Sequence, residues 1–346
     1  MLMSHRRQDK ESEDINFEQL VAREMYGNVR RLGDRLLYIR DHIDWKPFRK
    51  MVASVFNDND QTGGRPHTDE LVVVRALLLQ GWYGLSDEEL EYMCNDRLSF
   101  RNFLGYPDRI PDFTTVWKIR ERLQQAGIDQ KIWDEIQRQL VDQGYNLKKG
   151  VIQDATFIDA DQGKKRIQEE KKAEKAGEKI EYTDKQQSHM DKDGTFAKKG
   201  MNLHHGYKSH IKSDVDFGFI RQMVVTTANV NDCLVQLVRK GDIKAYRDKG
   251  YFHAPLPEGV LDGTLYRKPP GRVMPSRMDF RNKMLAKVRG LGERPFAVIK
   301  RVFHGDRTFV KTLERVRIKE IFKGIAYNMY NLFTCDRKRL ARARSV

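Results

Sequence analysis

The chain has 346 residues, and its 64 Lys and Arg residues outnumber its 49 Asp and Glu residues, which gives a formal net charge of +15 at pH 7. This length permits two domains with a core each, or one domain with extensions. The basic excess indicates a polyanionic partner, nucleic acid before an acidic membrane surface. No apolar run approaches the roughly 20 residues that cross a bilayer, and the first residues lack the apolar segment of a signal peptide. We therefore expect a cytoplasmic protein that does not act in a membrane.

The first part of the chain is expected to be helical. Residues 1–25 are polar and mixed in charge, with little to bury, and we predict a flexible arm. Between residues 26 and 147, apolar residues recur at spacings near three and four, which predicts a domain of amphipathic helices. Ser86 precedes Glu89 by three residues, the spacing of a capping box that starts a helix.

One predicted helix of this domain, residues 115–125, projects the basic residues Lys118, Arg120 and Arg122. In a helix-turn-helix-like block such a helix would face DNA, and we predict that these three residues bind DNA. The alternative is a solvated helix whose basic residues balance local acids. Composition and spacing leave both possibilities open.

A predicted strand follows, residues 151–160, with the sequence VIQDATFIDA. Asp154 lies inside this apolar run, and an acid in such a position must be hydrated, paired or bound to a metal. Residues 161–199 are charged and almost without apolar residues, which indicates an excursion from the core. Residues 205–211 and 219–226 then predict a β-hairpin. With later short strands and a helix-rich end, the pattern indicates a mixed α/β fold.

Three acids stand out in this region: Asp154 in the first strand, Asp248 at the end of a later strand, and Glu293 at the start of a late helix. Carboxylate oxygens suit Mg²⁺ or Mn²⁺, and two such ions about 4 Å apart can activate a water and stabilise the leaving oxygen of a phosphodiester. The alternative is that these acids only cap strand ends and a helix N-terminus. Asp159 could share the metal, but it is five residues from Asp154, which places it on the opposite face of the strand.

A group of histidines lies in the predicted hairpin. Alternate strand positions send His204 and His205 to opposite faces. His204, His205 and His210 also have no fourth ligand nearby in the sequence, so a zinc site is not indicated. These histidines, together with Lys208, either line the path of DNA or belong to a surface hairpin. We predict that Lys208 binds DNA.

An ordered series of segments carries a resemblance to a known family. GRPHTDELVVVRALLLQGWYGLSDEELEYMCNDRLSFRNFLGY and PDFTTVWKIRERL resemble the N-terminal domain of insertion-sequence transposases of the IS-five family. The segments similar to the catalytic domain follow in the same order: DATFIDA, KKGMNLHHGYKSHIKSD, VVTTANVND, RDKGYF and GERPFAVIKRVF. The series runs over nearly the whole chain, from about Leu32 to Leu332.

The resemblance implies a helical DNA-binding domain over residues 26–147, an RNase H-like mixed-sheet catalytic domain over residues 148–334, and a basic tail over residues 335–346. It also implies a DDE triad. The first-strand DAT motif puts the first acid at Asp154, the DKGY motif puts the second at Asp248, and the E-x-P-F motif puts the third at Glu293.

A late signature of the family consists of Tyr, Arg, Glu and Lys in fixed spacing. Arg289, Glu293 and Lys300 match it, whereas the tyrosine position falls on Ala286. This departure removes the basis for a DNA contact by the tyrosine and leaves the metal site unaffected. By the resemblance, Arg289 and Lys300 steady phosphates at the catalytic site.

The function implied is a DDE transposase that binds terminal inverted repeats, cuts DNA and joins the freed ends to a target. Its cofactor would be Mg²⁺ or Mn²⁺, with two ions at the three acids. Its partner would be double-stranded DNA, bound by a homodimer or larger assembly in the synaptic complex. The protein would be located in the cytoplasm, associated with the nucleoid. The rival interpretations are a metal-dependent nuclease without strand transfer and an inactive, transposase-derived DNA-binding protein.

Overall fold

The structure is a computed structural model, and it describes residues 17–56, 67–161, 169, 172–177, 180–188 and 190–344. Helices occupy the first part of the described chain. They are α1 (Phe17–Arg31), α2 (Arg35–His42), α3 (Lys46–Ala53), α4 (Glu70–Tyr83), α5 (Asp87–Asp96), α6 (Leu98–Leu104), α7 (Phe113–Gln125) and α8 (Ile128–Asp142).

Side chains at the helix ends explain why several of these helices begin where they do. Ser86 and Glu89 form the predicted capping box at the start of α5, and Asp69 and Asp112 cap α4 and α7. Residues 17–25, which the sequence places in a flexible arm, form the first turns of α1. The remainder of that arm, residues 1–16, lies outside the described residues.

The second part of the chain builds a mixed sheet. Its strand order is β2-β3-β1-β5-β6, and β4 also pairs with β3. β1 is antiparallel to β3 and parallel to β5, while β3 and β4 form the predicted hairpin. The strands are β1 (Val151–Asp159), β2 (Thr195–Lys199), β3 (Asn202–Asp214), β4 (Ile220–Thr227), β5 (Lys244–Arg247) and β6 (Leu261–Thr264).

The predicted excursion at residues 161–199 is described only in part, and it contains helix α10 (Asp184–Ser188) and strand β2. The short 3-10 helices η1 (Asp232–Leu234) and η2 (Lys249–Tyr251) flank β5. The predicted fold class is confirmed, because a helical N-terminal region is followed by a mixed sheet with helices.

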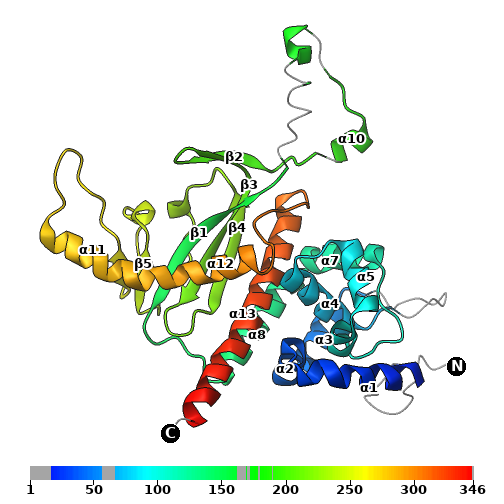
Figure 1. The fold of residues 1–346 in the computed structure, drawn as a ribbon. Helices are drawn as coiled ribbons and strands as arrows, with labels where there is room; N and C mark the ends of the chain where they lie inside the picture. The colour runs from blue at the N-terminus through cyan, green and yellow to red at the C-terminus, as the bar shows by residue number, and fades with distance from the viewer. Residues whose placement is uncertain are drawn as a thin grey trace.

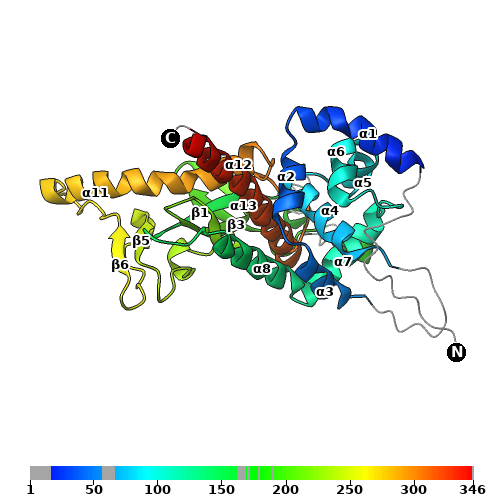
Figure 2. The same cartoon turned by 90° about the horizontal axis from the view of Figure 1, so that it is seen from below.

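Three helices end the chain, namely α11 (Ser276–Arg289), α12 (Glu293–Arg301) and α13 (Leu313–Arg344), with the 3-10 turn η3 (Gly290–Gly292) between the first two. α11 and α12 run one after the other beside the sheet, and α11 extends past its edge (Figure 2). α13 passes between the sheet and the N-terminal helices (Figure 1). It continues through residues 335–344 of the predicted tail, where Asp336 accepts hydrogen bonds from the hydroxyls of Tyr38 and Tyr145.

One buried apolar cluster joins the two parts of the molecule. It contains residues of the N-terminal helices, Phe219 and Ile220 beside the sheet, and Phe322 and Ile325 of α13. A Cβ on Gly81 of α4 would lie 3.0 Å from backbone atoms of Phe322, so only glycine allows the two helices to approach this closely. The helical part and the sheet therefore share one continuous core, although the chain changes from helices to strands near residue 148. Within the described residues, no helix combines the length and apolar character needed to cross a membrane.

Arg120 lies inside this core, and the prediction that it binds DNA is wrong for that reason. Its side chain is 1% exposed. It donates two hydrogen bonds to the Asp87 carboxylate, at 2.6 and 2.8 Å, and one to Gln80 at 3.0 Å. Burial by itself would raise the pKa of Asp87, but the hydrogen bonds and charge of Arg120 outweigh it and lower that pKa. Arg120 thus links α7 to α4 and α5.

We expect Asp87→Asn to lower the free energy of unfolding by about 3 kcal/mol, because it leaves the buried Arg120 charge without an anion. Urea unfolding of the two proteins measures this difference. The advantage of the wild type is complete above the ordinary carboxyl pKa of 3.8 and is lost as the pH falls through the lower pKa of the folded state.

The matched control is Glu88→Gln, since Glu88 is exposed on the same helical turn. Its effect should stay within about 0.5 kcal/mol. Equal stability of Asp87→Asn and the wild type at pH 7 would show that the Arg120 contact does not stabilise the fold.

Candidate active site

Asp154 and Asp248 lie side by side at the ends of one strand pair. The parallel ladder between β1 and β5 ends with Gln153 opposite Arg247, and each of these residues is followed by an acid. Neighbouring strands are about 4.8 Å apart, so the two acids leave adjacent backbone positions. The strands that position them come from segments more than 80 residues apart in the chain, which no local sequence pattern relates.

The Asp154 carboxyl is held in an unusual electrostatic environment. Burial raises its pKa, and the charge of Asp248 adds to that effect, while Arg289 and the backbone N–H of Ala155 act in the opposite direction. The net result is a pKa above the ordinary value. The carboxylate form therefore gains from any additional cation that reaches it.

Arg289 brings the third acid to this place. Its guanidinium donates to Asp154 Oδ2 at 2.9 Å and to Glu293 Oε1 at 3.3 Å. Arg289 ends α11 and Glu293 begins α12, and the spacing of four residues through η3 keeps the two side chains on one face. The structure thus gathers Asp154, Arg289 and Glu293, as the family signature implies.

A glycine allows η3 to lie against β1. Gly292 is buried, and a Cβ at this position would lie 2.5 Å from Cγ2 of Ile152, two residues before Asp154. Such a separation does not occur between real carbon atoms, so any other residue would push the start of α12 away from β1. Gly292 therefore sets the distance between Glu293 and the Asp154 strand.

The acids fit a hard divalent cation by their chemistry, because carboxylate oxygens are the ligands that such ions prefer. Asp154 and Asp248 are near enough for the charge of one to raise the pKa of the other. The third acid is the most exposed of the three, since the Glu293 side chain is 68% exposed and bonded to Arg289. Among the described residues, no three His, Cys, Asp or Glu side chains are grouped closely enough to hold a metal ion.

Lys300 lies on α12. Burial lowers its pKa, and the acids that oppose this effect are Asp159, Asp306 and Glu320. Lys199, at the end of β2, is a residue that the sequence did not single out. Its charge lowers the pKa of both Asp154 and Lys300. Lys199 stands at the end of a long run of charged residues, and no local sequence pattern distinguishes it from the other lysines there.

The predicted DNA contact of Lys208 is wrong, because its amine is used inside the fold. It donates to Val230 O at 2.7 Å and to Asp232 Oδ1 at 2.8 Å, and the residue is 9% exposed. His204 is also occupied, since its Nδ1 lies 2.9 Å from Oδ1 of Asp159. Lys118 and Arg122 differ from these residues, because both are exposed on α7.

Comparison with known protein families gives two matches. The Transposase domain (DUF772) matches residues 24–122, and the Transposase DDE domain matches residues 145–329. The second match alone spans more than half of the chain and contains Asp154, Asp248 and Glu293. No solved structure matches the chain. Members of this family generally use divalent metal ions. The chain therefore belongs to the DDE transposase family, whose members are enzymes that cut DNA and transfer its strands.

Proposed function

We propose that this protein is the transposase of an insertion sequence of the IS-five family, and that it cuts the ends of its element and joins them to target DNA. The observation that carries the proposal is the pair of acids that follow the last paired residues of β1 and β5, Asp154 and Asp248, with Glu293 tied to the first of them through Arg289. If these acids only capped secondary structure, an arginine that bonds both Asp154 and Glu293 would not be expected.

Asp154 and Asp248 would hold Mg²⁺ or Mn²⁺, and Glu293 would complete a set for two ions. When bound, such ions supply an activated oxygen nucleophile and stabilise the leaving oxygen of the phosphodiester. Arg289 already reaches both Asp154 and Glu293, so a phosphate oxygen held by its guanidinium would lie beside the carboxylates. Lys300 and Lys199 would steady the DNA strand by their charge.

The helical region would recognise the terminal inverted repeats, with Lys118 and Arg122 as its DNA contacts on α7. Both are exposed and lie on one helix, whereas Arg120 and Lys208 are occupied within the fold. Two ends of an element must be held together for joining, and we propose a homodimer or larger assembly for that step. The protein would act on nucleoid DNA in the cytoplasm.

Asp154→Asn is expected to reduce DNA cleavage at least about 100-fold and to leave duplex binding unchanged, because it removes a metal ligand and no DNA contact. The assay supplies element ends, target DNA and Mg²⁺, and it resolves cut products from joined products. Asp134→Asn, which changes an exposed acid on α8, is the control.

Cleavage by Asp154→Asn at the wild-type rate would remove the metal-site proposal. Cut products without joined products from the wild type would instead identify a nuclease. Binding without either product would identify an inactive DNA-binding protein.

Gly292→Ala is expected to reduce cleavage by about 100-fold, because the new Cβ meets Ile152 and a shift of about 1 Å in the catalytic groups has an effect of that size. Gly290→Ala is the matched control, since nothing lies within 4 Å of a Cβ at that position. Ile152→Ala combined with Gly292→Ala should restore part of the activity. Equal rates for the two glycine variants would show that the packing of η3 on β1 does not position the site.

Lys118→Ala and Arg122→Ala should each weaken duplex binding and each reduce the slope of log affinity against log salt by about 1, because each would release one phosphate contact. Fluorescence anisotropy at several salt concentrations measures the slope. Lys131→Ala, an exposed lysine on α8, is the control. An unchanged slope in both α7 variants would show that DNA binds to another surface of the protein.

A further inference from the structure

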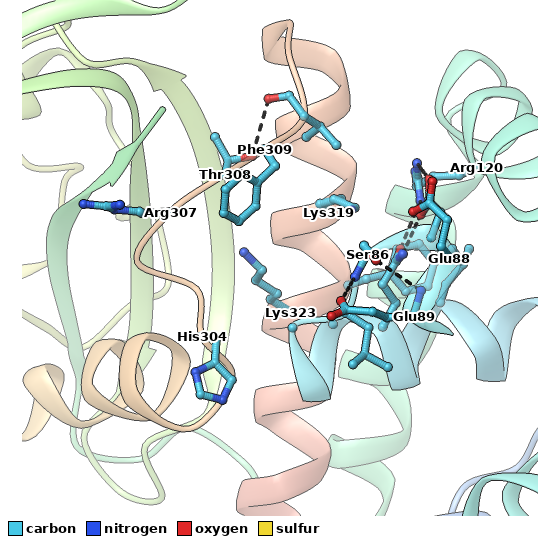
Figure 3. A pocket seen from close by; sticks show the side chains of 18 residues that line it. Ser86, Glu88, Glu89, Arg120, His304, Arg307, Thr308, Phe309, Lys319 and Lys323 are labelled. Carbon is cyan, nitrogen blue, oxygen red and sulfur yellow. Dashed lines mark hydrogen bonds and ion pairs between the residues drawn. The ribbon is translucent and has the colours of Figure 1, made fainter. Parts of the chain in front are cut away.

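A charged cavity lies apart from the acid site. Its volume is about 310 Å³, and its walls come from the junction of α4 and α5, from α7, from α13 and from the chain that follows α12. Figure 3 shows Lys319 and Lys323 of α13 on one side and Ser86 and Glu89 of α5 on the other. None of the acids or bases assigned to the active site lines this cavity.

Lys319 is one of the charged residues that line this cavity. It makes no hydrogen bond or ion pair with the residues that the structure describes. The two acids whose charges act on Lys319 are paired with other bases: Asp87 with Arg120, and Glu320 with Lys323 at 2.6 Å. Burial and the neighbouring Arg120 lower the pKa of Lys319 to about 8. A half-buried ammonium group without an anion favours the entry of one.

The rim of the cavity indicates which anion would enter. Phe309 lines it with a side chain that is 91% exposed, and Figure 3 shows its ring near the amine of Lys323. A free inorganic ion makes no use of an exposed aromatic ring. A nucleotide does, because its base stacks on the ring while its phosphate meets the lysine.

We propose that this cavity binds a nucleotide of a DNA strand whose base is unpaired, with the phosphate at Lys319 and the base against Phe309. The proposal rests on the action of the family on DNA and is independent of the metal site. The cavity joins the helical region, α13 and the chain after α12, so a strand bound there connects the DNA-binding region with the helix that carries Glu293 and Lys300.

The test measures binding to the full-length Asp154→Asn protein without divalent ions, so that failure of the catalytic proposal does not affect it. The probes are a labelled single-stranded oligonucleotide, the same strand with abasic sites, and inorganic phosphate as competitor. Lys319→Gln should weaken binding of the single strand about tenfold, and Lys131→Gln, an exposed lysine on α8, should not. Phe309→Ala should weaken binding of the normal strand about tenfold and leave the abasic strand unaffected.

Glu88→Gln keeps the test independent of any folding defect in the lysine variant. Glu88 lines the cavity and is exposed, so removal of its negative charge should strengthen binding of the strand by about threefold. Equal binding by Lys319→Gln and Lys131→Gln would overturn the proposal. Displacement of the strand by an equal concentration of inorganic phosphate would also overturn it, because the cavity would then be a site for a simple ion.

Discussion

The contact between α4 and α13 is the constraint on which the rest of the structure depends. Gly81 lets the backbone of α4 approach that of Phe322, and the apolar residues around this point form one core with those beside the sheet. A bulkier residue at Gly81 would separate the two helices. Because α13 also contacts β4 and α8, the N-terminal helices and the sheet are held in one arrangement by the same helix.

The acid site follows from that arrangement through two further contacts. The parallel pairing of β1 with β5 places Asp154 next to Asp248, and the fit of Gly292 against Ile152 brings the start of α12 to the same strand. Burial beside another carboxylate is unfavourable for the charged form of Asp154, and Arg289 offsets part of that effect. The site therefore combines a buried carboxyl, a second carboxyl and an arginine on strands and helices that hold them in place. Such a set of charges suits the binding of cations and of phosphates.

The basic residues of the chain serve two different purposes. Arg120 and Lys208 are buried and bonded to Asp87 and Asp232, so their charges stabilise the fold. Lys118 and Arg122 are exposed, and Lys319 faces a cavity without a partner of its own. An excess of +15 therefore indicates the class of partner and does not indicate which lysines and arginines meet it.

The resemblance to a known family pointed to the three motif acids. Local spacing in the sequence predicted the helices of the N-terminal region, the capping box at Ser86 and the β3–β4 hairpin. These features depend on residues that are close together in the chain, so a sequence pattern can record them. The tertiary structure alone decided that Arg120 and Lys208 are occupied, that Arg289 is bonded to Asp154, and that Lys199 lies near Asp154. The partners of most of these side chains come from distant segments, and the energy of a charge depends on its burial and neighbours, which only the folded chain defines.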